Sequence, residues 1–271
     1  MRALRLTALL YLGALLVAPV GLIFYRTFER GVGAAWHSVT TPEAQHAFWL
    51  TLVLVVIAVP LNTVFGVATA LLLERREFRG KSLLNSVIDL PFAISPVVVG
   101  LALILVYGRT GWFGDWFAEH GIRIIFSAPG MALATIFVCL PFVVREVQPV
   151  LREVGTEQEE AARTLGASPS QTFWRITLPA IRWGVGYGVV LSTARALGEF
   201  GAVAVVSGRI SGVTETATLR VQERFEAFDP VGAYSASVVL ALMGVAVLLF
   251  MNLLERRRKR PRAQTTTEGL A

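Results

Sequence analysis

The chain alternates between long apolar runs and shorter polar segments. The apolar runs cover about residues 6–25, 47–73, 83–107, 128–150, 181–207 and 231–254. Each run is near the ~20 residues that a helix needs to cross the hydrocarbon core of a bilayer. The pattern therefore predicts an all-α, polytopic membrane protein with six transmembrane helices.

The first apolar run follows Arg2 and Arg5, as the core of a signal peptide would. It spans residues 6–25, however, and a signal-peptide core is only ~7–15 residues long. No A-x-A cleavage sequence follows it. We interpret this run as a retained first span.

The composition supports the membrane assignment, and the positions of the basic residues explain the positive net charge. Only 16% of the residues are charged and the mean hydropathy is +0.61, whereas a soluble domain has about 25% charged residues. The net charge of +6 would suit a nucleic-acid-binding protein. The basic residues instead cluster beside the apolar runs and in the tail, and no nucleic-acid motif is present, so we expect no nucleic-acid partner.

The distribution of Lys and Arg predicts the orientation of the spans. With a cytoplasmic N-terminus, the inside segments carry 16 basic residues and the outside segments carry 7. Short cytoplasmic loops are enriched in Lys and Arg. We therefore expect both termini, and the polar segment at residues 151–180, to be cytoplasmic.

A polar segment, TEQEEAARTLGASPSQTFWRITLP, interrupts the apolar pattern at residues 156–179. Thr156 and Glu159 form a T-x-x-E capping box, which predicts a helix that begins at Glu157. Its acidic residues then lie at the positive end of the helix dipole. The helix is expected to end at Gly166, because glycine readily adopts the left-handed conformation that follows a last helical turn.

A second short helix is predicted directly after this glycine corner. Ser168 and Gln171 form another capping box, with Pro169 at the first helical position, where its missing N–H has no cost. The helix is expected to reach about Thr177 and to end before Pro179. We call residues 156–179 the hairpin. These signals leave two interpretations open: a hairpin lying on the lipid head groups, or a surface that docks onto another protein.

The spacing of the hairpin resembles the EAA loop of ABC-importer permeases in every fixed position. The matching string is E-A-A, three residues, G, nine residues and I-x-L-P. The resemblance implies that this loop is the coupling helix that sits in a groove on a separate ATP-hydrolysing subunit. It also implies a type I importer (MetI-like) bundle. The residues that carry it are Glu160, Ala161, Ala162, Gly166, Ile176, Leu178 and Pro179.

Ionisable residues inside the fifth apolar run are a second candidate site. Arg195 and Glu199 are four residues apart, so they share a helix face and can pair. The pair is either structural or lines a translocation path or gate. Gly198 and Gly201 flank Glu199 and Phe200, and permit close helix packing or a bend.

Prolines and charges mark the other spans. Four prolines indicate helices that can bend, which suits alternating access; these are Pro60, Pro91, Pro96 and Pro141. The Ser95 hydroxyl is a candidate partner for the backbone groups that the third-span prolines free. Arg145 and Glu146, at the end of the fourth span, either orient the hairpin or extend to the head groups.

The chain also resembles the sulfate/thiosulfate permease, W subunit (CysW family), through DLPFAISPVVVGL, IFVCLPFVVREVQPV and RALGEFGAVAVVSG. The likeness runs from about Trp49 to the sixth span. It implies a bacterial inner-membrane permease that works as a heterodimer with a T-type permease, beside two copies of an ABC ATPase and a periplasmic sulfate/thiosulfate-binding protein. It also implies a permease domain at residues 47–251, after a first span and outer loop at 1–46 and before a basic tail at 252–271.

Other classes of function remain as alternatives. The GEFG string is shared with molybdate permeases, so a molybdate or tungstate importer is the nearest alternative, although the continuation VVSGRISG favours sulfate. A secondary transporter would need no ATPase. The chain lacks a Walker A sequence, so it is not expected to be an enzyme and ATP is expected to be hydrolysed by a partner. With one cysteine, Cys139, and no ligands at metal spacing, no metal or cofactor is expected.

Overall fold

The computed structural model describes residues 2–258, and this range is helical without a β-strand. The helices are α1 (Arg2–Leu12), α2 (Ala18–Phe28), α3 (Val32–Thr40), α4 (Pro42–Arg75), α5 (Lys81–Ala93), α6 (Pro96–Tyr107), α7 (Gly114–Glu119), α8 (Ala128–Val154), α9 (Glu157–Thr164), α10 (Pro169–Thr172), α11 (Leu178–Leu197), α12 (Gly201–Val206), α13 (Ala217–Glu226) and α14 (Pro230–Arg258). Two π-helical turns, Gly13–Val17 and Phe173–Thr177, join α1 to α2 and α10 to α11.

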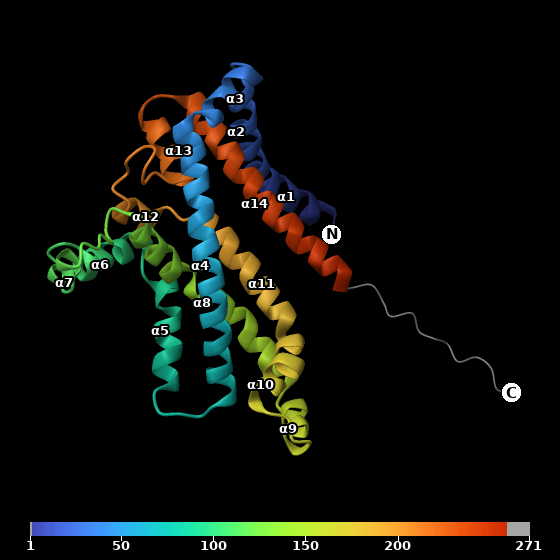
Figure 1. The fold of residues 1–271 in the computed structure, drawn as a ribbon. Helices are drawn as coiled ribbons and strands as arrows, with labels where there is room; N and C mark the ends of the chain where they lie inside the picture. The colour runs from blue at the N-terminus through green and yellow to red at the C-terminus, as the bar shows by residue number, and fades with distance from the viewer. Residues whose placement is uncertain (1, 259–271) are drawn as a thin grey trace.

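Helices α4, α8 and α11 form the centre of the bundle (Figure 1). All three helices approach one another closely around Val143 of α8. A β-carbon added to Gly66 of α4 would lie 2.7 Å from the Val143 β-carbon, and one added to Gly188 of α11 would lie 2.8 Å from its α-carbon. Glycine is therefore needed on both neighbouring helices, because it lets their backbones approach the α8 side chain directly.

The buried side chains form two main apolar clusters at different levels of the bundle. The hairpin-end cluster consists of Val67, Ala70, Leu73, Ile88, Val143, Val144, Val147, Leu151 and Ile181. The far-end cluster consists of Leu50, Leu54, Val99, Ile125, Met131, Ala132, Ala134, Val138, Ala202, Val203, Val206 and Leu219. Pro60 of α4 and Pro141 of α8 fall between the two levels. Each proline therefore lies where its helix passes from one cluster to the other.

The helices agree with the predicted apolar runs in position but not all in continuity. Within residues 2–258, four helices are long and apolar enough to cross a membrane: Arg5–Phe28, Pro42–Arg75, Ala128–Val154 and Pro230–Val247. The third run is broken between Ala93 and Pro96, where α5 and α6 meet at 113°. If this pair counts as one span, the number is five. Six spans therefore remain a prediction.

The prediction of one continuous fifth span at residues 181–207 is wrong. Helix α11 ends at Leu197, and α12 begins at Gly201. Gly201 packs against the start of α6, since a β-carbon there would lie 2.9 Å from the Pro96 β-carbon. This contact fixes α12 against α6 rather than along the axis of α11.

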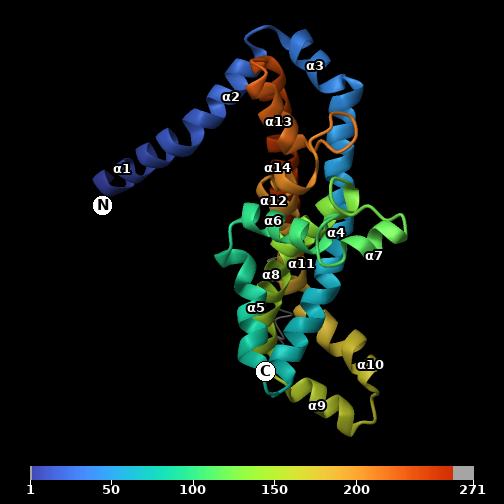
Figure 2. The ribbon, with the colours of Figure 1, turned by 90° about the vertical axis from the view of Figure 1, so that its left-hand side faces the viewer.

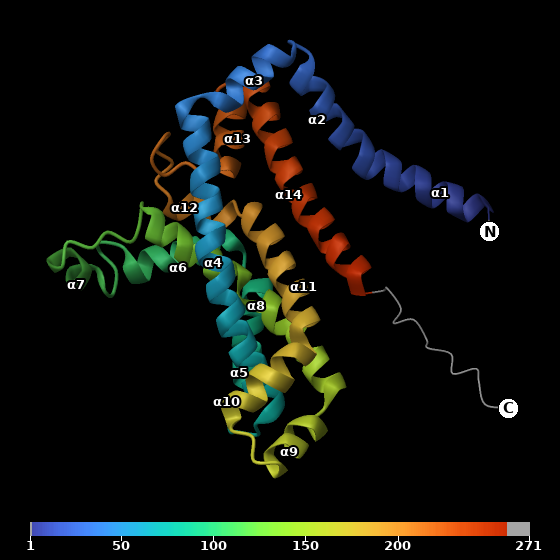
Figure 3. The same cartoon turned by 45° about the vertical axis from the view of Figure 1, so that its right-hand side comes forward.

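The N-terminal helix stands apart from the bundle. It meets α14 near α2 and then diverges from it toward α1, as Figures 2 and 3 show. Among the side chains described in its apolar 18-residue stretch within Arg5–Phe28, none is buried. This separation agrees with its treatment as an addition before the permease domain, although the domain boundaries themselves remain predictions. Most of the predicted basic tail, residues 259–271, lies outside the described range.

Candidate functional site

The hairpin lies at one end of the bundle, beyond α4 and α8 (Figure 1). Its first helix, α9, begins at Glu157 as predicted. The corner has the hydrogen bonds of a Schellman motif: Gly166 N–H donates to the Arg163 carbonyl at 3.0 Å, and Ala167 N–H donates to the Ala162 carbonyl at 3.0 Å. The φ of Gly166 is +85°, which confirms the left-handed glycine corner.

The second capping box is confirmed. Gln171 N–H donates to the Ser168 hydroxyl at 3.3 Å, and Ser168 N–H donates to the Gln171 side chain at 2.9 Å. The predicted end before Pro179 is wrong, because the helix continues through a π-helical turn into α11. Within this turn Leu178 N–H bonds to the Phe173 carbonyl, five residues back. The shift from i−4 to i−5 hydrogen bonds accommodates Pro179, which has no backbone N–H to donate.

The first capping box is not formed. Thr156 makes no side-chain cap hydrogen bond. Glu159 instead turns toward the bundle, where its side chain is 9% exposed. Nε of Arg75, at the end of α4, donates to this carboxylate at 3.1 Å, and the Thr177 hydroxyl donates to it at 3.0 Å. The carboxylate has a stronger partner in a guanidinium than in its own helix terminus, and so the local capping signal is overridden.

Arg75 joins the hairpin to the end of the bundle. Besides binding Glu159, its guanidinium donates to the Leu151 carbonyl at 3.1 Å and to the Gly155 carbonyl at 2.7 Å. Its side chain is 14% exposed. One arginine therefore holds the C-terminal ends of α4 and α8 and the first turn of α9 in a fixed arrangement. Sequence reasoning missed Arg75, which is 84 residues away from its partner.

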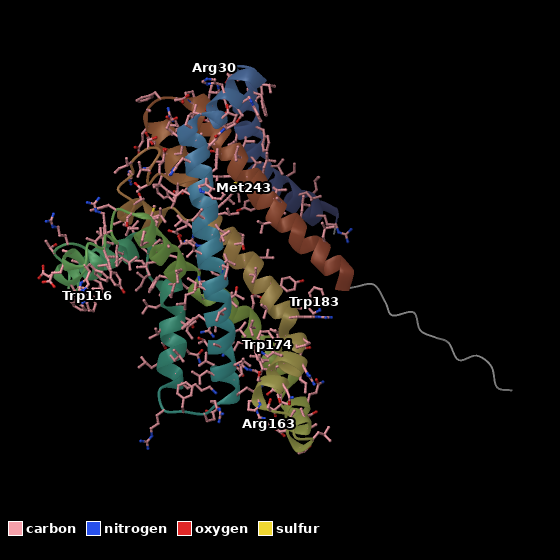
Figure 4. All side chains as sticks on the ribbon, viewed as in Figure 1. Arg30, Trp116, Arg163, Trp174, Trp183 and Met243 are labelled. Atoms are coloured by element: carbon pink, nitrogen blue, oxygen red, sulfur yellow. The ribbon has the colours of Figure 1, made fainter. Side chains whose placement is uncertain are left out.

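The hairpin divides the residues of the EAA resemblance between a packed and an exposed face. Ala162 is buried, and Ile176 and Leu178 are half-buried. Residues Glu160, Ala161, Gly166 and Pro179 are exposed. The same exposed region carries two large apolar side chains, Leu165 at 89% and Trp174 at 63% exposure. Figure 4 places Arg163 and Trp174 at this end of the molecule. An exposed face with apolar residues and a rigid base has the character of a docking surface.

The predicted pair at the end of α11 is present. Nη1 of Arg195 lies 2.7 Å from Oε2 of Glu199, a contact that has ion-pair distance without hydrogen-bond geometry. The other carboxylate oxygen accepts the backbone N–H of Ala202 at 2.9 Å. The Glu199 side chain is 1% exposed and that of Arg195 is 31% exposed. The carboxylate therefore lies inside the bundle, while the guanidinium reaches its surface.

The remaining residues of this second candidate site lie at the break between α11 and α12. Gly198 follows the last residue of α11, Phe200 is 37% exposed, and Gly201 opens α12. The hydroxyl of Thr218 donates to the Glu199 carbonyl at 2.7 Å and so ties this break to α13.

Comparison with known proteins agrees with this geometry. Residues 62–260 match the family described as binding-protein-dependent transport system inner membrane component. The chain belongs to this family. It is 54% identical over 250 residues to the sulfate transport system permease protein CysW of Synechocystis sp., covering 92% of this chain and 91% of that protein. It is 42% identical over 245 residues to the sulfate transport system permease protein CysT of Synechococcus elongatus, covering 90% and 88%.

The fold of this family member is also found in a solved structure. A chain of a bacterial ABC transporter involved in the import of the acidic polysaccharide alginate superposes with a TM-score of 0.79. The match covers 96% of each chain at 18% sequence identity, so it concerns the fold alone. The predicted all-α fold of an ABC-importer permease is confirmed, and the chain is a multi-pass membrane protein.

The permease carries a third charged cluster at the end of the bundle opposite the hairpin. Arg220 of α13 donates to Glu215 at 3.2 Å and to the Thr41 hydroxyl at 3.1 Å. The Glu215 side chain is 1% exposed. Burial, together with the negative charge of the nearby Glu223, raises the pKa of Glu215 from 4.5 to about 7. The loop before α13 therefore contains a carboxyl group that titrates near neutral pH, which sequence reasoning did not identify.

Proposed function

We propose that this chain is the membrane-spanning permease subunit of an ATP-driven importer that passes sulfate or thiosulfate into the cytoplasm. The observation that carries the proposal is the hairpin, a rigid corner with an exposed face at one end of a membrane bundle. The substrate class rests on the likeness to CysW, which extends over nine-tenths of the chain.

The hairpin is proposed to dock into a groove on a separate ATPase subunit. Its exposed face offers Glu160 and Ala161 beside Leu165, and burying one leucine side chain contributes about 1.5–3 kcal/mol to an interface. Arg75 and Glu159 support this face from behind, so a displacement imposed on it is passed to α4 and α8. The hairpin end is then cytoplasmic, as the excess of basic residues indicates. ATP is hydrolysed by the partner.

The proposed assembly contains two different permeases, two ATPase copies and a periplasmic sulfate/thiosulfate-binding protein. The chain is similar to both CysW and CysT, and it is closer to CysW, which supports a W-type role beside a T-type partner. The family description itself refers to transport that depends on a binding protein.

The break between α11 and α12 is proposed to line the translocation path or its gate. Arg195 is the cation there that could attract an oxyanion, although Glu199 offsets its charge. Gly198, Phe200 and Gly201 surround this pair at the break. Replacing Arg195 with Ala is expected to reduce both sulfate transport and sulfate-stimulated ATP hydrolysis in the reconstituted importer. Unchanged values of both would remove Arg195 from the path.

The substrate is tested by uptake of labelled sulfate in cells that lack only this chain. We expect uptake to be lost and to be restored by the wild-type chain, with thiosulfate competing and molybdate not competing. Competition by molybdate or tungstate, with no requirement for a second permease, would favour the alternative importer. Uptake that persists without the partner ATPase would favour a secondary transporter.

A further inference from the structure

Helix α5 is attached to the bundle by few contacts. Ile88 is its one buried residue, and it packs into the hairpin-end cluster. The next residue, Asp89, makes a two-pronged ion pair with Arg145 of α8, in which Nε and Nη2 of the arginine lie 2.7 Å and 2.5 Å from the two carboxylate oxygens. An apolar contact has no preferred direction, whereas a bidentate Arg–carboxylate pair fixes both distance and orientation. The pair therefore orients α5 on α8, together with the edge-to-face contact between Phe92 and Phe142, whose ring centroids are 5.4 Å apart.

A continuous series of polar contacts leads from this ion pair to the base of the hairpin. Nη1 of Arg145 donates to the Gln148 side chain at 2.8 Å, and the amide of Gln148 donates to Glu74 at 2.8 Å. Glu74 also accepts from Arg152 at 2.7 Å. The residue after Glu74 in α4 is Arg75, the arginine that holds the hairpin. We call Asp89, Arg145, Gln148 and Glu74 the polar series.

The C-terminal end of α5 leads directly into a bend of the chain. It ends at Ala93, and the chain turns by 113° into α6. Helix α6 packs against a different element, α12, where a β-carbon on Gly100 would lie 2.7 Å from the Val205 β-carbon. Residues 94–95 thus separate a helix held at the hairpin end from a helix held by α12. A shift of α8 relative to α12 would be absorbed at this bend.

We propose that Asp89, Arg145 and Gln148 are positioning residues that transmit displacement of the hairpin to α5 and so to the bend before α6. The inference rests on the proposed coupling role of the hairpin. The ATPase moves the hairpin, Arg75 passes the movement to the ends of α4 and α8, and the polar series makes α5 follow. Arg145 is therefore part of the link to the hairpin, because its guanidinium is engaged by Asp89.

The test uses the complete importer reconstituted in vesicles with its sulfate-binding protein. Asp89→Asn removes the charge that orients α5. We expect the ATPase to remain bound, basal ATP hydrolysis to persist, and sulfate-stimulated hydrolysis and sulfate moved per ATP to fall at least about fivefold, the lower end of ordinary coupling between sites. Asp89→Glu, which keeps the charge, is expected to retain most of the coupling.

The matched control is Glu77→Gln. It breaks the ion pair between Glu77 and Lys81, which is 2.7 Å long, lies at the start of α5 and is not part of the polar series. We expect normal coupling in this variant. Normal coupling in Asp89→Asn as well would overturn the proposal, as would an equal loss in both variants.

Two further results keep the outcome interpretable. If Asp89→Asn does not assemble with the ATPase, the proposal is tested with Gln148→Met instead. This variant interrupts the polar series between Arg145 and Glu74 without changing any charge, and sulfate-stimulated ATP hydrolysis is again measured. Reduced stimulation in that variant supports the proposal and unchanged stimulation overturns it. Failure of the proposed function itself would look different, since the wild-type importer would then show no stimulation by sulfate at all.

Discussion

Replacing Glu159 with Gln should loosen the hairpin from the bundle without altering its exposed face. The carboxylate accepts from Arg75 Nε and Nη2 at 3.1–3.3 Å and from the Thr177 hydroxyl at 3.0 Å. Glutamine is nearly the same size and retains one acceptor oxygen. Its amide nitrogen, however, would face the guanidinium donors, and the charge that compensates Arg75 is lost.

The size of the effect follows from burial and from the bonds that remain. Removing one partner of a buried ion pair costs about 3–5 kcal/mol. Arg75 keeps its bonds to the Leu151 and Gly155 carbonyls, so its charge is not left alone. A single hydrogen bond to a charged group contributes about 1.5–3 kcal/mol. We therefore expect the free energy of local opening of the hairpin to fall by about 2 kcal/mol, which is about thirtyfold in the opening equilibrium.

Amide hydrogen exchange of peptides from α9 measures this opening directly. The matched control is Glu160→Gln, because Glu160 is the next residue, is exposed, and makes no side-chain hydrogen bond among those found in residues 2–258. We expect faster exchange in the Glu159 variant alone and weaker binding of the ATPase in the Glu160 variant. Equal exchange protection of α9 in the two variants would refute the reasoning.

Three further changes test other parts of the structure. Gly188→Ala places a carbon 2.8 Å from the α8 backbone, and this overpacking should cost about 1–3 kcal/mol and lower the thermal unfolding temperature in detergent. The control Gly186→Ala has nothing within 4 Å of the added carbon and should leave the unfolding temperature unchanged. Gly166→Ala meets no atom within 4 Å but must adopt a φ of +85°, so hydrogen exchange at the corner should reveal about 1–2 kcal/mol of local strain. The raised pKa of Glu215 means that the folded state keeps a proton that the unfolded chain loses, so stability decreases as pH rises from 4.5 through about 7. Glu223→Gln should make this decrease smaller, as measured by thermal unfolding between pH 5 and 8. An unchanged dependence on pH would contradict this role of Glu223.

Local signals in the hairpin were predictable where their partners are also local. Ser168 and Gln171 are three residues apart and form their box, and Gly166 takes the left-handed conformation, because both depend on backbone geometry within one turn. Glu159 had an equally good local signal that failed. Its actual partner, Arg75, comes from another helix, and no spacing rule connects residues 84 positions apart.

The spans show the same division between local and tertiary causes. Hydropathy located the apolar helices, because the cost of exposing a polar backbone to lipid acts on each run separately. The break after α11 depends on Gly201 meeting Pro96, and the pair between Asp89 and Arg145 depends on how α5 lies against α8. These features arise only after the helices have packed. The pair of Arg195 and Glu199 was predictable since its members are four residues apart.

The central claim is that this chain moves sulfate only when a partner ATPase acts on its hairpin. The most direct test is accumulation of labelled sulfate in vesicles that contain the complete importer, with the sulfate-binding protein present on the outside and nucleotide enclosed inside. We predict accumulation with ATP and none with a non-hydrolysable analogue. Equal accumulation with the two nucleotides would contradict the account.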